Sequence, residues 1–228
     1  MLYVYMDYRK ALLLHLFCLT AFFSIISCSE QTKSNTDKSQ QVQYVDSKAV
    51  VNVLDEPIKT PGNVDEIQKA YSAIMEKLEN GTLDSTSFKY SCNNEKSGTV
   101  SYFSEKGRLR MIVHRYNEYD HYAAVDRYFV ADSAVFFVYL NGVSWSFEGG
   151  TEGATKDNIT ERRVYLIDQQ AVRCLEKKFT VRSQATSNPR SETVPNKEVD
   201  CASLKSILKP YQLLAAYRYS APSGCLED

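Results

Sequence analysis

Three related stretches of the chain decide its fold: YFSEKGRLRMI (residues 102–112), YFVADSAVFFV (residues 128–138) and YLIDQQAVRCL (residues 165–175). Each one joins two apolar runs through a few polar residues that favour turns, so each predicts a β-hairpin. Aligning them gives two sets of equivalent residues: Leu109, Val135 and Val172, and two positions later Met111, Phe137 and Cys174. Because side chains two residues apart on a strand share a face, we expect these six to face one core.

Further strands accompany the hairpins. The stretches SFKYSC (residues 87–92) and GVSWSFE (residues 142–148) alternate apolar and polar side chains, which is typical of strands with one buried face. The segment EGGTEGATKDN (residues 148–158) is rich in Gly and Thr and predicts a long loop before the last hairpin. With 16 Tyr and 10 Phe against nine Gly and six Pro, the composition also favours strands. We therefore expect an antiparallel meander of about seven or eight strands.

One helix precedes the predicted sheet. Asn63 and Glu66 have the spacing of a capping box, and Gly81 fits the position after the last helical residue. Between them, apolar residues recur at steps of three and four: Val64, Ile67, Ala70, Tyr71, Ile74 and Leu78. This spacing predicts an amphipathic helix over residues 64–80 that packs on the sheet.

The C-terminal segment CASLKSILKPYQLLAAYRY (residues 201–219) also has helical spacing, but Pro210 should kink the helix or end it there. We expect a short helix and a second helical turn. The fold class is therefore α+β, an antiparallel β-meander sheet packed with one N-terminal helix and a short C-terminal helical segment. The alternative is a sheet that closes into a barrel, because the second face carries apolar residues too, namely Ile112, Phe136, Val138 and Leu175.

The N-terminus predicts export. A short basic start precedes ALLLHLFCLTAFFSII (residues 11–26), which is shorter than a bilayer span of about 20 residues and fits a secretory signal peptide. This run ends in Ile25-Ile26-Ser27-Cys28, which resembles the lipobox of bacterial lipoproteins. The resemblance implies that Cys28 is acylated, with palmitate or a similar chain, and becomes the first residue of the mature protein.

The same resemblance implies a place in the cell envelope, anchored to a membrane through the lipid on Cys28. Stable anchoring takes two or more acyl chains, which such modification supplies. Ser29 follows the cysteine, and in the well-studied sorting rule this implies the outer rather than the inner membrane. Residues 29–41 contain no aliphatic or aromatic side chain and predict a flexible tether. The expected organisation is a signal peptide (residues 1–27), a lipid-anchored tether (residues 28–60) and a single α+β domain (residues 61–228).

Export changes the cysteine count. Cys18 leaves with the signal peptide and Cys28 carries lipid, so four cysteines remain: Cys92, Cys174, Cys201 and Cys225. An oxidising compartment permits two disulfides with three possible pairings, and buried free thiols are the alternative. We favour Cys201–Cys225, because that bond would fix the terminal segment. The chain contains no CxxC that would indicate a redox or zinc motif.

The densest group of reactive side chains lies in HRYNEYDHY (residues 114–122) and consists of His114, Glu118, Asp120 and His121. Two imidazoles and two carboxylates could bind a divalent metal ion, or supply a base and an orienting acid. The alternative is a solvated turn between two strands. No HExxH, Gly-flanked serine or P-loop supports an enzyme, and no cofactor is indicated.

Two other groups could bind a ligand. Aromatic side chains could form a platform for a sugar ring or a peptide, because flat rings give contact area at little entropic cost. The candidates are Tyr116, Tyr119, Tyr122, Tyr128, Tyr139 and Trp145, and the alternative is the half-buried face of an ordinary sheet. The run DNITERR (residues 157–163) predicts a surface cluster of ion pairs, with an anion or partner contact as the alternative.

The balance of charge bears on partners. The chain has 27 Lys plus Arg against 28 Asp plus Glu, which disfavours binding to nucleic acid. We expect a non-enzymatic envelope lipoprotein that binds a protein or a glycan. The alternatives are a lipid-anchored hydrolase or metal-binding protein that uses the group at residues 114–121, and an inhibitor or immunity-type lipoprotein.

Overall fold

The structure is a computed structural model that describes residues 59–93, 95–150 and 152–226. The predicted signal peptide, the acylation of Cys28 and nearly all of the predicted tether lie outside the described residues.

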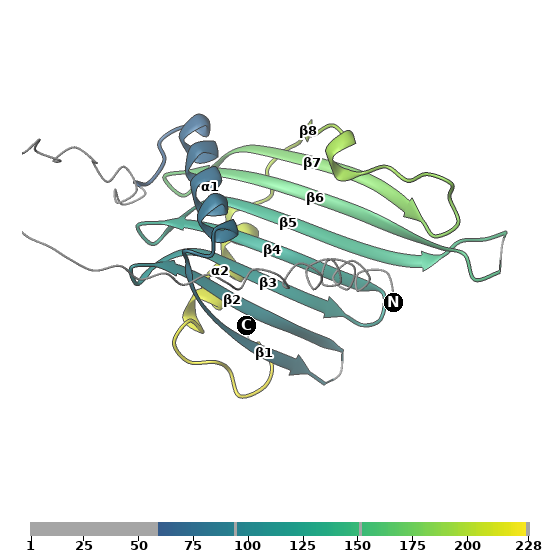
Figure 1. Ribbon diagram of the computed structural model, residues 1–228, viewed down its shortest axis with the longest axis horizontal. Coiled ribbons are helices and arrows are strands. Elements are labelled where there is room, and N and C mark those ends of the chain that lie inside the picture. The colour runs from purple at the N-terminus through teal and green to yellow at the C-terminus, as the bar shows by residue number, and fades with distance from the viewer. Residues whose placement is uncertain (1–58, 94, 151, 227–228) are drawn as a thin grey trace, which may run out of the picture. The chain divides into compact units, whose positions relative to one another are not determined.

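Eight antiparallel strands form a single sheet in which each strand pairs with the next one along the chain (Figure 1). The strands are β1 (Asp84–Cys92), β2 (Lys96–Glu105), β3 (Arg108–Glu118), β4 (Tyr122–Ala131), β5 (Ala134–Phe147), β6 (Thr155–Ile167), β7 (Gln170–Arg182) and β8 (Lys197–Glu198). The predicted meander is confirmed. Within the described residues the sheet is open, with β1 at one edge and β8 at the other. The predicted long loop is shorter than expected, because β6 begins at Thr155 and leaves residues 148–154 as the connection.

Three of the hairpins have two-residue turns, at residues 106–107, 132–133 and 168–169, and all six turn residues have positive φ. Positive φ at both central positions is typical of type I′ turns, whose twist matches that of the flanking strands. Each turn is followed by a β-bulge, where the register shifts by one residue in the outgoing strand. The extra residues are Arg110, Phe136 and Val172, which have no partner in the strand register.

These bulges overturn the prediction of a single core. A bulge moves the following residues of a strand to the other face, so side chains two apart across it point in opposite directions. Met111 and Phe137 belong to one core cluster, whereas Leu109, Val135 and Cys174 belong to the other, and Val172 is 48% exposed. The third repeat also starts one residue earlier than the alignment places it. Counted back from its turn, Val164 rather than Tyr165 is equivalent to Tyr128.

The helix α1 (Val64–Glu79) covers one face of the sheet, called the α1 face. The Asn63 side chain accepts a hydrogen bond from the backbone N–H of Glu66 at 2.9 Å, and Gly81 follows the helix with a φ of 65°. Both ends therefore form as the sequence predicts. Ile67 and Ile74 are fully buried against the sheet, in the cluster that contains Met111, Val113, Phe129, Phe137 and Tyr165.

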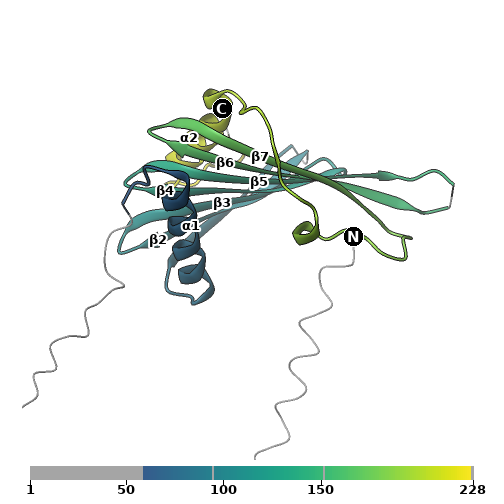
Figure 2. The same cartoon turned by 90° about the horizontal axis from the view of Figure 1, so that it is seen from above.

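The helix α2 (Leu204–Ala216) covers the opposite face, called the α2 face (Figure 2). Its buried residues Ile207 and Leu214 pack in the cluster that contains Ile112, Tyr128, Val138 and Leu166. Pro210 does not end the helix, and the expected second helical turn is not a separate element, because α2 continues through Pro210 to Ala216. The predicted kink stays a prediction. A proline inside a helix costs about 3 kcal/mol, whereas burying each aliphatic side chain contributes about 2 kcal/mol. The two anchors on either side of Pro210 therefore outweigh its cost.

Two disulfides, Cys174–Cys201 and Cys92–Cys225, attach the C-terminal strap (residues 201–225) to the sheet. Their Cα–Cα distances are 5.3 Å and 4.7 Å. The two bonds confirm that the four cysteines are disulfide candidates, but the favoured pair Cys201–Cys225 is wrong. The reason is that α2 separates these two residues and crosses the sheet, which brings Cys201 beside β7 and Cys225 beside β1.

Disulfides are typical of proteins that fold in an oxidising compartment outside the cytoplasm. Across the described part of the chain, no helix has both the length and the apolar character needed to cross a membrane.

Both helices lie over the end of the sheet that contains the three two-residue turns. Figures 1 and 2 show that the strands continue beyond them on both faces, toward the β3–β4 turn and the β5–β6 loop. We call this part the open half of the sheet. Its side chains are available to contact something other than the core.

Candidate functional site

A row of small residues crosses the open half on the α2 face. The strand register places Gly98, Ala124 and Gly142 in one line with Tyr116 between the first two. A Cβ atom on Gly142 would lie 2.6 Å from the hydroxyl oxygen of Tyr122, and one on Gly98 would lie 2.9 Å from the Cβ of Tyr116. Gly142 therefore gives the Tyr122 ring room to lie close to the sheet, and Gly98 does the same for the Tyr90 ring, which a Cβ there would approach to 2.8 Å.

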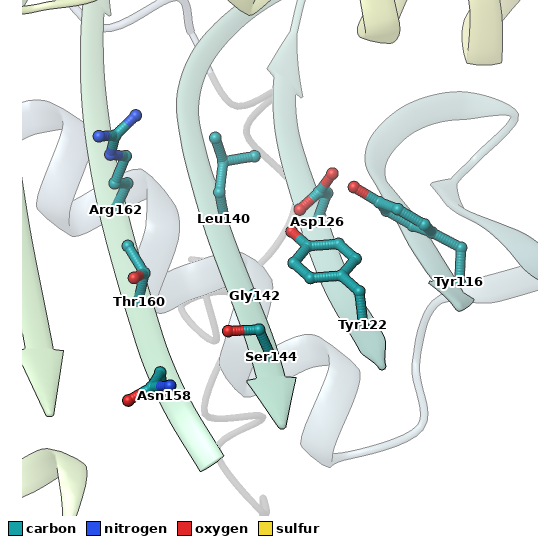
Figure 3. A pocket seen from close by; sticks show the side chains of 9 residues that line it. All are labelled: Tyr116, Tyr122, Asp126, Leu140, Gly142, Ser144, Asn158, Thr160 and Arg162. Carbon is teal, nitrogen blue, oxygen red and sulfur yellow. The ribbon is translucent and has the colours of Figure 1, made fainter. Parts of the chain in front are cut away.

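This arrangement leaves a hollow of about 280 Å³ in the α2 face, shown in Figure 3. Its lining comes from four neighbouring strands and consists of Tyr116, Tyr122, Asp126, Leu140, Gly142, Ser144, Asn158, Thr160 and Arg162. Side chains that hydrogen-bond dominate this set, and one carboxylate is among them. Ligand sites are commonly hollows of this kind with a few converging polar groups.

The carboxylate of Asp126 is the centre of the site. Figure 3 shows the hydroxyl groups of Tyr116 and Tyr122 turned toward it from neighbouring positions. Hydrogen bonding by Tyr116 lowers the pKa of Asp126 and opposes the rise in the pKa of Tyr122. Burial raises the pKa of Asp126 to about 6, against the opposing effects of the Tyr116 hydrogen bond and of nearby basic groups. Asp126 is therefore mostly ionised at neutral pH and becomes protonated in mild acid.

His114 lies beside Tyr116 on the same face of β3 and holds its ring in place. It is 7% exposed, its Nε2 lies 2.7 Å from the Tyr90 hydroxyl, and its ring stacks on that of Tyr116 with 4.4 Å between centroids. Burial, assisted by the charge of Lys96, lowers the pKa of His114 to about 4. The imidazole is therefore neutral at pH 7, and it provides an uncharged surface on which the Tyr116 ring packs.

The opposite wall of the hollow comes from β6. Arg162 pairs with Glu176 at 2.6 Å, and the Asn158 side chain accepts a hydrogen bond from Thr180 at 3.1 Å. Both side chains are exposed, so their remaining donors face solvent. The hollow thus has an acceptor on one side and donors on the other.

The four predicted metal ligands do not come together. His114 points to the α2 face, Glu118 pairs with Lys96 at 2.7 Å, and the other two, Asp120 and His121, lie in the β3–β4 turn. No group of three or more His, Cys, Asp or Glu side chains that could hold a metal ion occurs in residues 59–93, 95–150 and 152–226.

The predicted aromatic platform is divided between locations. Tyr116 and Tyr122 lie together in the hollow, with ring centroids 6.2 Å apart. Trp145 instead belongs to the tip of the sheet, where it packs on His121 with 4.4 Å between centroids and its indole N–H donates to the Asp120 carbonyl. Three candidates remain: Tyr119 is 68% exposed in the turn, Tyr128 is buried under α2 and Tyr139 lies on the α1 face.

The run at residues 157–163 is only partly a surface cluster. Arg162 is exposed, but Glu161 is 2% exposed on the α1 face. Its carboxylate lies 3.2 Å from Arg163 and 4.0 Å from Lys177. Although burial opposes the shift, hydrogen bonds from Ser191 and Tyr139 and the charge of Arg163 lower the pKa of Glu161.

Sequence reasoning missed Asp126, which belongs to no motif. Asn158 and Thr160 lie in the run at residues 157–163, but nothing in the sequence showed that they face Asp126, because the three come together only through the register of β4, β5 and β6. A usable signal did exist in Gly98 and Gly142, since a glycine inside a strand often marks a close approach by another group.

Comparisons with known proteins add no relative: no family model matches the chain, and no curated protein or solved structure matches it.

Proposed function

We propose that this protein binds a neutral saccharide in the hollow of the α2 face and does not act as an enzyme. The observation that carries the proposal is the carboxylate of Asp126, held beside two tyrosine hydroxyls over a floor of small residues. The arrangement is assembled by the sheet itself, so it is in place before a ligand arrives. Preorganisation of this kind lowers the cost of binding.

The chemistry of the lining matches a sugar. A carboxylate accepts hydrogen bonds from adjacent hydroxyl groups of one ring, and bonds to a charged acceptor contribute about 1.5–3 kcal/mol each. Asn158 and Arg162 supply donors from the opposite wall. Tyr122 supplies an aromatic surface for the apolar face of the ring.

Binding fits this lining better than hydrolysis. Glycoside hydrolysis generally uses a pair of carboxylic acids that flank the scissile bond. Among the described residues that line the hollow, Asp126 is the single carboxylate. The hydrolase or metal-binding alternative and the inhibitor or immunity alternative gain no supporting contact in the described residues.

The proposal includes a lipid anchor. The lipobox-like motif that ends at Cys28 and the polar residues after it support a protein tethered to an envelope membrane, preferentially the outer one. The two disulfides are compatible with that compartment. Mass spectrometry of the mature N-terminus tests the anchor: an acylated Cys28 is expected, and an unmodified N-terminus elsewhere would contradict it.

Calorimetric titration tests the binding site. The mature chain with Cys28→Ser, which carries no lipid, is titrated with a panel of neutral mono- and disaccharides. We expect at least one to bind, and Asp126→Asn to weaken it by a factor of about 10 or more through loss of a charged acceptor. Affinity should also fall below about pH 6, where Asp126 takes up a proton.

Asp120→Asn is the matched control. It removes the same charge from the β3–β4 turn, outside the hollow, and should leave affinity unchanged. If no neutral sugar binds, or if the two variants weaken binding equally, the proposed site is wrong.

A further inference from the structure

The other face of the same strands carries a second hollow, of about 570 Å³. It lies in the open half and its α1-face lining includes Ser97, Thr99, Asn117 and Asn141 together with the basic residues Lys89 and Arg115. None of the described residues that line it is acidic. The lining therefore contains neutral hydrogen-bonding groups, and its charged side chains are all basic.

Positive charge is concentrated along neighbouring strands here. The register places Lys89, Thr99 and Arg115 in one row across β1, β2 and β3. Arg127 on β4 is the diagonal neighbour of Arg115, because it pairs with Val113 two residues earlier on β3. Although Arg115 reaches solvent, partial burial and the nearby charge of Arg127 both lower the pKa of its guanidinium group. The two guanidinium groups are thus close enough to repel each other.

These cations have no carboxylate to neutralise them. Among the ion pairs of the described residues, neither Arg115 nor Arg127 has a partner within 4.0 Å, and Arg127 instead lies over the Tyr139 ring at 5.4 Å. The buried acid farther along the row, Glu161, is already engaged by Arg163 and Lys177. An anion placed beside Arg115 would relieve the repulsion between the two arginines.

We infer that this second hollow binds an acidic sugar, meaning a saccharide that carries a carboxylate, sulfate or phosphate group. The oxyanion pairs with Arg115 and Lys89, since guanidinium and ammonium groups are the usual partners of such anions. The sugar hydroxyls bond to Ser97, Thr99 and the two asparagines, and the volume suits one or two rings. A simple inorganic anion would leave these neutral groups unused.

This inference does not depend on the neutral-sugar site, because the two hollows lie on opposite faces and share no side-chain surface. Tyr116 is in the lining of both hollows, but its side chain points to the α2 face. Variants of one site therefore leave the other intact, and the two proposals fail separately.

The test is a titration of the mature chain carrying Cys28→Ser with three probes: glucuronate, glucose and inorganic sulfate. We expect glucuronate to bind at least 10-fold more tightly than either glucose or sulfate, with an affinity that falls as salt is added. Arg115→Gln and Lys89→Gln should each weaken glucuronate binding about 10-fold or more, because each removes one charged donor.

Two control variants separate the alternatives. Arg108→Gln removes another exposed arginine, at the start of the same strand, and should have no effect on glucuronate binding. Asp126→Asn should also have none. The inference is overturned if glucuronate binds no more tightly than glucose, if sulfate alone binds as tightly, or if both Arg115→Gln and Lys89→Gln, folded by their melting curves, bind like the parent.

Discussion

His114 and Asp126 are cross-strand partners whose protonation equilibria move in opposite directions. Burial lowers the pKa of His114 from 6.5 to about 4 and raises that of Asp126 from 3.8 to about 6. Between pH 6.5 and pH 4, His114 is protonated in the unfolded chain but neutral in the folded protein. The free energy of unfolding that His114 contributes therefore falls as the pH falls. The folded protein binds a proton at Asp126 that the unfolded chain releases, so the aspartate makes stability rise as the pH falls.

The two effects should nearly cancel. Each pKa unit corresponds to about 1.4 kcal/mol, so His114 removes about 3 kcal/mol of stability between pH 6.5 and pH 4. Asp126 is half-buried, and after an allowance for solvent screening it returns about 2 kcal/mol over the same range. The parent protein should therefore lose about 1 kcal/mol from this pair.

Single substitutions should expose each component. Compared with the parent, the free energy of unfolding of Asp126→Asn should fall by about 2 kcal/mol more between pH 6.5 and pH 4, because the contribution of Asp126 is gone. That of His114→Gln should fall by about 3 kcal/mol less over the same range, because the contribution of His114 is gone. Urea denaturation at a series of pH values measures both, and His121→Gln, a substitution of an exposed histidine, should follow the parent. If Asp126→Asn and the parent have the same pH slope, the opposing-shift argument is refuted.

Three further outcomes follow from packing and covalent structure. Gly142→Ala places a methyl group 2.6 Å from the Tyr122 hydroxyl. It should lower the free energy of unfolding by about 1–3 kcal/mol, as measured by thermal or urea denaturation. The disulfides Cys92–Cys225 and Cys174–Cys201 close loops of 133 and 27 residues. Loop entropy therefore predicts that Cys225→Ser lowers the free energy of unfolding by about 5 kcal/mol and Cys201→Ser by about 3.5 kcal/mol. Equal losses would contradict this account. Glu161→Gln should cost about 3 kcal/mol at neutral pH, because it removes the carboxylate beside the buried Lys177 and the partly exposed Arg163. That deficit should shrink as the pH falls below 4.5, because the depressed pKa of Glu161 stabilises the fold only while the carboxylate is ionised.

Local features of the fold could be predicted from the sequence. The ends of α1 follow from Asn63 and Gly81, and the hairpins follow from alternating side chains around polar turns, because these signals act within a few residues. The bulges at Arg110 and Phe136 could not be predicted, since an extra residue in one strand is recognised only against its partner. The assignment of residues to faces failed at these points.

The site required non-local information. The sequence placed Tyr116 and Tyr122 among its aromatic candidates, but it could not say that their hydroxyl groups turn toward Asp126 in a hollow that also has a wall from β6. That arrangement depends on the register of four strands, which no short motif encodes. The disulfide pairing failed for the same reason, because it depends on the path of α2 across the sheet.

The order of the disulfides has a consequence for biogenesis. The pairing is nested: of the four cysteines in disulfides, the first to be synthesised, Cys92, pairs with the last, Cys225. An oxidase that joined cysteines in order of appearance would produce Cys92–Cys174, which links strands at opposite sides of the sheet, and leave Cys201 to pair with Cys225. The native pairing therefore requires that Cys92 stay reduced until Cys225 has been synthesised, or that a catalyst exchange early bonds for the native ones.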